Sequence, residues 1–245
     1  MLGRAVVLVV ACLGPVRAAR AQGGPPLETD DPGTPGSGHL ELNLSTEAER
    51  EGGGTTYDAP RFDANLGVGT RFQLKLEVPW RVVTAPDQPT TTGIGNVGVG
   101  IKWRFLDGPV AVSTYPQSDL AGSESAADKG IAESETGLLL PIEVSWDPGP
   151  VAFDVEVGYE LGAGPDQVVY GLALSHLVRP SLELLGECHG SGDPDLTDQG
   201  VRCGLGFRWS LERWASLMGA YGDGVVGSPE NRPDYRLFGG VQLRW

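Results

Sequence analysis

The side chains that could do chemistry in this sequence are few and lie far apart. Ser175 and His176 are neighbours, and a serine beside a histidine is a candidate for a nucleophile and its base. Neighbouring side chains in a strand point to opposite faces, so these two cannot form such a pair if the stretch is a strand. His39 and His189 have no visible triad partner. The residue types therefore predict no catalytic residues and a protein that is not an enzyme.

Gly93, Gly95 and Gly98 spell GxGxxG, the glycine spacing of a dinucleotide-binding loop. That loop needs a strand before it and a helix after it, whereas here an alternating apolar pattern typical of a strand follows directly. We predict no nucleotide site and no cofactor. The glycines are expected to allow close backbone packing in a tilted strand.

An acidic group, Asp193, Asp195 and Asp198, has carboxylates that could ligate calcium. The glycine turn and distal glutamate of a calcium loop are missing, so a hydrated loop is the favoured interpretation. The same interpretation applies to a second acidic group, Glu124, Asp128, Glu133 and Glu135. The sequence predicts no metal site.

Cys188 and Cys203 are expected on the two strands of a hairpin centred on Pro194. Direct pairing requires residue numbers that sum to 391, and this register also places Glu183 opposite Arg208. Because the two pairings support each other, we predict a disulfide near the external rim, worth roughly 3 kcal/mol for a loop of this length in an exported protein. The alternative is two small buried thiols.

The first 21 residues are expected to be an export signal. Arg4 precedes an apolar run over 5–16, and the small residues of 19–21 form a cleavage site before Gln22. A lipoprotein box ending at Cys12 is the alternative, but the apolar run ahead of it is short. Loss of the three arginines in the signal takes the formal net charge from −14 to about −17. This charge argues against nucleic acid as a partner.

Behind a Pro/Gly-rich lead, residues 22–38, apolar and polar residues alternate with the period of strands. We count twelve such segments, at about residues 40–44, 62–68, 72–82, 97–105, 110–114, 138–146, 151–161, 168–178, 182–188, 201–209, 214–221 and 235–245. Their apolar face carries no Asp, Glu, Lys or Arg. Short connections at 70–71, 107–109, 147–150, 179–180 and 210–213 alternate with long ones, as in a membrane barrel.

This pattern predicts an all-β fold, a single twelve-stranded antiparallel up-and-down transmembrane β-barrel over residues 39–245. No stretch after residue 20 is apolar enough for a spanning helix. A soluble β-sandwich would show a similar alternation, so the aromatic residues are needed to choose between the two folds.

Tryptophans and tyrosines separate by strand end in this topology. The first set is Trp103, Trp146, Trp209, Trp214 and Trp245, and the second is Tyr115, Tyr159, Tyr170, Tyr221 and Tyr235. Membrane barrels carry aromatic girdles at both interfaces, whereas a sandwich core gives no reason for this separation. We therefore predict two girdles and membrane lipid as a partner. The strand that ends at Trp245 is expected to pair with the first strand and close the barrel.

The charged residues of the strands fall on the opposite parity and are expected to line the lumen. The candidates are Glu41, Asp63, Lys75, Glu77, Lys102, Arg104, Glu143, Asp154, Glu156, Glu183, Glu187, Arg202, Arg208, Arg236 and Arg244. Such a wall either lines a narrow aqueous path or fills it with salt bridges. The sequence leaves both open, and also whether the lead hangs free or plugs the lumen.

Two stretches, PLETDDPGTPGSGHLELNL (26–44) and GIGNVGVGIKWRF (93–105), resemble the outer-membrane proteins grouped as the MetA pathway of phenol degradation. The resemblance implies a twelve-stranded outer-membrane barrel, recognition of its last strand by the barrel-insertion machinery, and passage of small aromatic or hydrophobic molecules. It does not cover the acidic stretch 117–136.

We therefore predict an outer-membrane channel for passive uptake or efflux of small solutes. The alternative is a non-transporting structural or surface-binding barrel with acidic external loops.

Overall fold

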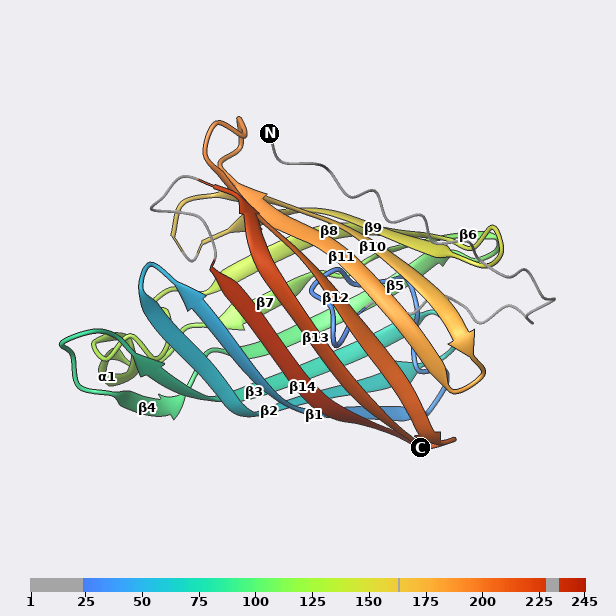
Figure 1. Ribbon diagram of the computed structural model, residues 1–245, viewed down its shortest axis with the longest axis horizontal. Helices are drawn as coiled ribbons and strands as arrows, with labels where there is room; N and C mark the ends of the chain where they lie inside the picture. Colours follow the sequence, from blue (N-terminus) through green and yellow to red (C-terminus); the bar gives the residue numbers. More distant parts are fainter. Residues whose placement is uncertain (1–23, 163, 228–233) are drawn as a thin grey trace, which may run out of the picture.

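The structure is a computed structural model that describes residues 24–162, 164–227 and 234–245 (Figure 1). Its elements are β1 (Leu40–Glu51), β2 (Gly54–Val68), β3 (Phe72–Thr84), β4 (Thr91–Ile94), β5 (Val97–Leu106), β6 (Val110–Thr114), β7 (Gln117–Leu120), α1 (Glu124–Ala127), β8 (Gly137–Trp146), β9 (Ala152–Leu161), β10 (Gln167–Arg179), β11 (Leu182–Gly192), β12 (Gln199–Glu212), β13 (Ala215–Val226) and β14 (Tyr235–Arg244). The predicted export signal lies outside the described residues.

These segments form a closed antiparallel barrel of twelve strands, which confirms the predicted fold. β4 and β5 are two parts of one strand that both pair with β3, and they are separated at Gly95 and Asn96. β6 and β7 are likewise one strand, interrupted at Tyr115 and Pro116, and both pair with β8 in one register.

The barrel closes where the last strand pairs with the first. β14 pairs with β1 from Glu41 and Arg244 to Arg50 and Tyr235. At the rim the pairing continues by two backbone bonds, since Leu40 and Trp245 each donate to the carbonyl of the other at 3.1 and 3.0 Å. The chain stays ordered to its final residue because an open edge would leave unpaired backbone groups on both strands.

Side chains are sorted so that the apolar ones face outward. Leu74, Ile101, Val157, Leu184 and Leu237 are each 43 to 55% exposed on the outer surface. The interior instead buries polar groups, from Asn43 and Gln242 to a set of charged residues. A water-soluble sandwich has the opposite distribution. The single closed sheet excludes that alternative.

The connections at one end of the barrel are mostly shorter than those at the other. Tight connections at 69–71, 107–109, 147–151, 180–181 and 213–214 lie at the end that also carries Leu40 and Trp245, which we call the turn end. The opposite end carries the connections 52–53, 85–90, 121–136 and 193–198, together with the ends of β9 at Leu161 and of β13 at Val226, and we call it the loop end. The first of these was predicted to be long, which is wrong. β1 and β2 both continue past the predicted segments to a turn at Gly52 and Gly53, each with positive φ.

Tyr115 was predicted to belong to an aromatic girdle, and its position in the structure shows that this is wrong. Its side chain is 1% exposed and lies in the lumen. Pro116 hides the continuity of β6 and β7, so the strand was expected to end before the tyrosine. In the continuous strand Tyr115 follows the outward-facing Thr114 and must point inward. Its ring lies over Gly100, where an added Cβ would come within 3.0 Å of Tyr115 Cε2.

The remaining predicted girdle residues lie on the outer surface. Trp103, Trp146, Trp209, Trp214 and Trp245 are 46 to 61% exposed, and Tyr221 is 53% exposed. Tyr159, Tyr170 and Tyr235 are partly exposed. Trp103 stacks on Phe72 and Trp146 stacks on Phe153, with ring centroids 6.2 and 5.5 Å apart.

The stretch predicted as an acidic insert, 117–136, begins with strand β7 and continues as a folded loop at the loop end. Its buried residues are Ile131 and Ala132, and its backbone is held by Asn96, which bonds Glu133 through both side-chain amide atoms. Within the described ranges, no helix is long and apolar enough to cross a membrane.

Candidate functional site

The lead segment, residues 24–38, lies inside the barrel, which answers the question that the sequence left open. Figure 1 shows it in blue between strands on two sides of the barrel. Wall carboxylates accept its backbone N–H groups: Glu187 accepts from Glu28 at 2.9 Å and from Thr29 at 2.5 Å, and Glu156 accepts from Asp30 at 2.8 Å. A segment without regular secondary structure must find such partners when it is buried.

Wall cations bind the carbonyl groups at the start of the lead. Arg208 Nη2 donates to the Pro25 carbonyl at 2.7 Å, and Arg236 Nη1 donates to the Pro26 carbonyl at 3.0 Å. Both prolines lack an N–H, so this part of the lead presents only acceptors to the wall. The wall matches it with donors there, and it matches the N–H groups of residues 28–30 with carboxylate acceptors.

Ion pairs hold the acidic side chains of the lead. Lys102 Nζ lies 2.9 Å from Asp30 Oδ1, and it also donates to the Asp31 carbonyl. Arg202 Nη1 lies 3.1 Å from Glu28 Oε2. The Lys102 side chain is only 2% exposed, so these bonds act in a region largely closed to water.

An apolar contact and two glycines of the wall complete the fit between the lead and the barrel. Leu27 packs in a buried cluster with Ala173 and Leu185 from the wall. A Cβ added at Gly171 would lie 2.2 Å from Thr29 Oγ1, so the lead occupies the space that this glycine leaves. At the turn end a Cβ on Gly67 would meet the Gly36 carbonyl oxygen at 1.8 Å, so backbone passes against backbone there.

Asp31, in the lead, is 4% exposed. Burial raises its pKa to about 6, while the positive charge of Lys102 limits the rise. Its carboxylate accepts the backbone N–H of Gly33. The docked position of the lead therefore favours the protonated form of Asp31.

The wall around the lead is cross-linked by charge. The pairs include Arg236 with Glu47 at 2.6 Å, Arg208 with Glu183 at 2.8 Å, Arg61 with Glu77 at 2.6 Å, Lys75 with Glu77 at 3.0 Å, and Arg244 with Glu41 at 2.9 Å. The sequence left open whether the charged wall lines an aqueous path or fills the lumen with salt bridges. These pairs show that salt bridges fill part of the lumen.

The predicted lumen-lining residues occupy the inner faces of the strands. Buried ones are Asp63, Lys102, Glu143, Asp154, Glu156, Glu183, Arg202, Arg208 and Arg236. Partly buried ones are Glu41, Lys75, Glu77, Arg104, Glu187 and Arg244. Arg104 is set apart at the turn end, where Nη2 donates to the Thr70 carbonyl at 2.7 Å.

Three cavities adjoin one another along the lumen. The first, about 460 Å³, opens at the loop end, and the second, about 390 Å³, shares Glu28 and His189 with it. The third, about 60 Å³, shares Asp30, Asp63 and Lys75 with the second and extends to the turn end. The lead forms part of the lining of all three.

Every one of these cavities has an excess of carboxylates. The largest is lined by six carboxylates and one arginine, beside His189. The second is lined by eight carboxylates and three Lys or Arg residues, again beside His189. The smallest has four carboxylates and two lysines. The field along the lumen therefore favours positive charge.

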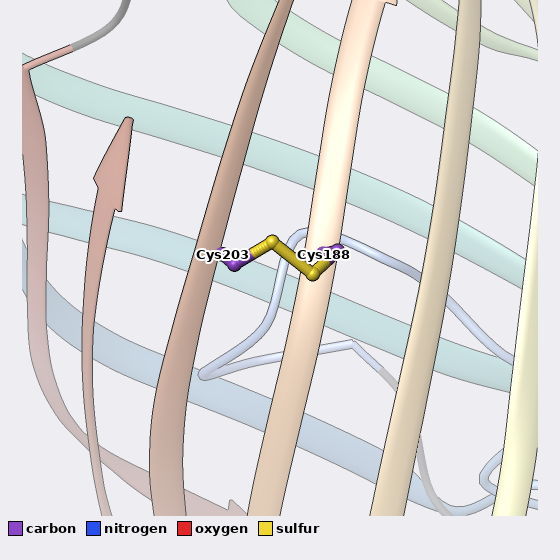
Figure 2. The surroundings of a disulfide bond; sticks show 2 residues. All are labelled: Cys188 and Cys203. Carbon is purple, nitrogen blue, oxygen red and sulfur yellow. A yellow bond between two sulfur atoms is a disulfide. The ribbon is translucent and has the colours of Figure 1, made fainter. Parts of the chain in front are cut away.

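Cys188 and Cys203 form a disulfide between β11 and β12 with Cα atoms 4.1 Å apart (Figure 2). They are directly opposed in the register that pairs Glu183 with Arg208. Both cysteines lie on the outward parity, and the residues next to them, Glu187 and Arg202, bind the lead from inside. The disulfide thus joins two strands that hold the lead.

The other sequence candidates do not come together. Ser175 is buried on the inner face, and the ring of His176 lies beside the Pro150 carbonyl at 2.6 Å. The GxGxxG stretch runs through β4 and β5. In the acidic loop, the Asp193 carboxylate accepts the N–H of Asp198 at 2.7 Å.

Sequence reasoning missed the residues of the lead itself, because the lead has no periodicity. It also missed the uncharged inner-face residues Leu139, Val169 and Phe238, which line the second cavity. Strand parity could have found these three, since each follows an outward-facing neighbour.

No protein-family model matches the sequence, and no curated protein matches it. Solved structures do match. An outer membrane channel from Pseudomonas putida F1 is 13% identical, with a TM-score of 0.66, over 85% of this chain and 96% of the other. The NanC porin is 10% identical, with a TM-score of 0.60, over 82% of this chain and 98% of the other. The KdgM porin is 9% identical, with a TM-score of 0.60, over 83% of this chain and 98% of the other. The fold is one that porins share. At these identities the likeness extends to the fold alone.

Proposed function

We propose that this protein is an outer-membrane channel for passive passage of small solutes, narrowed by its own lead segment. The observation that carries the proposal is the series of three adjoining cavities from the loop end to the turn end. A lumen filled completely by salt bridges would not leave such a series. We also propose that the protein has no enzymatic activity.

The membrane part of the proposal is supported by the apolar outer surface. Side chains such as Ile101 and Val157 are more than half exposed, which is unfavourable in water and favourable in hydrocarbon. The loop end would face the cell exterior and the turn end the periplasm, after export by the predicted signal peptide and assembly by the barrel-insertion machinery. The fold that this chain shares with porins supports the same placement.

The preference for aromatic or hydrophobic solutes, and the link to phenol degradation, are finer proposals. They are supported by the mixed lining of the second cavity, where the apolar side chains of Leu27, Leu139, Val169 and Phe238 lie among charged ones. Such a lining suits a solute with one apolar part and one polar part.

Conductance of the purified protein in planar lipid bilayers tests the proposal. We expect small, uniform current steps from the unaltered protein and larger steps from Glu187→Gln, which weakens the hold on the lead. A heat-modifiability gel of each sample, in which the folded barrel migrates as a compact band until boiled, ensures that folded protein is compared. Absence of steps from both proteins would contradict the channel and favour a non-transporting structural or surface-binding barrel.

A further inference from the structure

One patch of the lumen wall combines two carboxylates with two apolar side chains. It spans four neighbouring strands, β7 to β10. Glu160 on β9 is directly opposite Leu139 on β8, and Asp119 on β7 is opposite Gly137, two residues before Leu139. Val169 on β10 is opposite Gly158, two residues before Glu160. Asp119, Leu139, Glu160 and Val169 all line the second cavity.

The two carboxylates differ from the other acidic groups of this cavity. Glu47 and Glu77 each form ion pairs, at 2.6 Å with Arg236 and at 3.0 Å with Lys75. Among the described residues, no hydrogen bond or ion pair reaches the side chain of Asp119 or Glu160. Their charge is therefore available to a molecule in the cavity.

The apolar part of the patch is held in a fixed position. Leu139 Cδ1 lies over Gly158, where an added Cβ would come within 2.9 Å of it. Val169 is 7% exposed. An apolar group in the cavity would thus meet packed apolar side chains on both sides of Glu160.

We propose that this patch is a binding site for small organic cations, molecules with one ammonium group and one apolar group such as a single aromatic ring. The ammonium would bind between Asp119 and Glu160, and the apolar group would contact Leu139 and Val169. A cavity of about 390 Å³ can hold a molecule of this size. The excess of carboxylates around the whole cavity favours the same charge.

The binding site does not depend on transport. That the bound cation is also the solute of the channel rests on the proposed function. Binding and conductance are therefore measured separately, so that one can fail without the other.

The experiment compares three ligands of one shape and different charge: benzylammonium, benzyl alcohol and benzoate. Their binding to the folded protein in a non-ionic detergent is measured by isothermal titration calorimetry. We expect benzylammonium to bind at least about fivefold more tightly than the other two, the factor that one charge pair at 4 Å supplies in water. Equal or tighter binding of benzyl alcohol or benzoate would overturn the proposal without use of any variant.

Isosteric variants locate the site. Asp119→Asn and Glu160→Gln should each weaken benzylammonium binding about fivefold, and the double variant more. Glu135→Gln is the matched control, because Glu135 is an exposed carboxylate that lines none of the three cavities, and its affinity should stay within about twofold. Undiminished binding in the folded double variant, or an equal loss in the control, would overturn the assignment. If benzylammonium binds as expected but no current steps occur, only the channel proposal fails.

Discussion

Glu187 is the residue on which docking of the lead depends most directly, and replacing it tests the plug. In Glu187→Gln the side chain keeps its shape but loses its charge and one acceptor oxygen. In the unaltered protein, the Glu187 carboxylate accepts hydrogen bonds from the N–H groups of Glu28 and Thr29, at 2.9 and 2.5 Å. A hydrogen bond to a charged group contributes about 1.5–3 kcal/mol. Both bonds share Oε1, so an amide oxygen there can keep them only as neutral bonds, each worth about 0.5–1.5 kcal/mol, and we expect docking to weaken by about 2–3 kcal/mol.

A loss of this size raises the undocked population of the lead roughly 30- to 150-fold, since 1.4 kcal/mol is a factor of ten. The assay is limited digestion with a glutamate-specific protease, which cleaves after Glu28 only when the lead leaves the lumen. When docking is fast relative to cleavage, the cleavage rate follows the undocked population. We therefore expect cleavage at Glu28 to accelerate by about that factor.

The control for this measurement is Glu160→Gln, which alters a carboxylate of the same lumen that has no hydrogen bond or ion pair to the described residues of the lead. Its cleavage rate should equal that of the unaltered protein. The reasoning is refuted if Glu187→Gln is cleaved at the unaltered rate, or if the control accelerates to the same extent.

Three further predictions concern the lead and the disulfide. Gly67→Ala should displace the lead and enlarge the current steps, because its Cβ would meet the Gly36 carbonyl at 1.8 Å; Gly239→Ala, with open space around it, should not. In the docked lead the pKa of Asp31 is about 6, whereas its usual value is 3.8. The docked lead therefore holds a proton that the undocked lead has lost, and docking should weaken by roughly 3 kcal/mol as pH rises from 3.8 to 6. Cleavage at Glu28, taken relative to Asp31→Asn at each pH, should therefore accelerate over that range, and a flat ratio would contradict it. Replacing Cys188 and Cys203 with serine should lower the free energy of unfolding in urea by about 3 kcal/mol for the 15-residue loop, whereas an unchanged transition midpoint would contradict this.

The sequence predicts the barrel well because both of its faces follow a strict period. A slip of one residue would move every charged side chain to the apolar face, so parity and register are strongly determined. The pairing of Glu183 with Arg208 illustrates this, since one constraint from two cysteines fixes the register of β11 and β12 along their whole length.

Prediction fails where the period is interrupted. Pro116 conceals that Tyr115 belongs to a continuing strand, and the residues after Leu44 carry too many polar side chains to be recognised as a strand. The lead is harder still, because its main bonds join its backbone to side chains that are distant in sequence. Glu187 is about 160 residues from the groups it binds, and neither end shows a local pattern.

The charged residues of the lumen wall fall into two groups, those that bind the lead and those whose charge remains available to a solute. Inward orientation alone does not distinguish the two groups. Glu187 and Glu156 match backbone N–H groups, and Arg208 and Arg236 match proline carbonyls, so these four are complements of a peptide rather than of a solute. The two carboxylates bind the lead, and the two arginines also pair with Glu183 and Glu47 of the wall, so little of this charge is left for a solute. The selectivity of the lumen should then be set by charges that neither the lead nor the wall neutralises. If the proposed site is correct, the region around β7 and β9, and not the conspicuous arginines, determines which solutes bind.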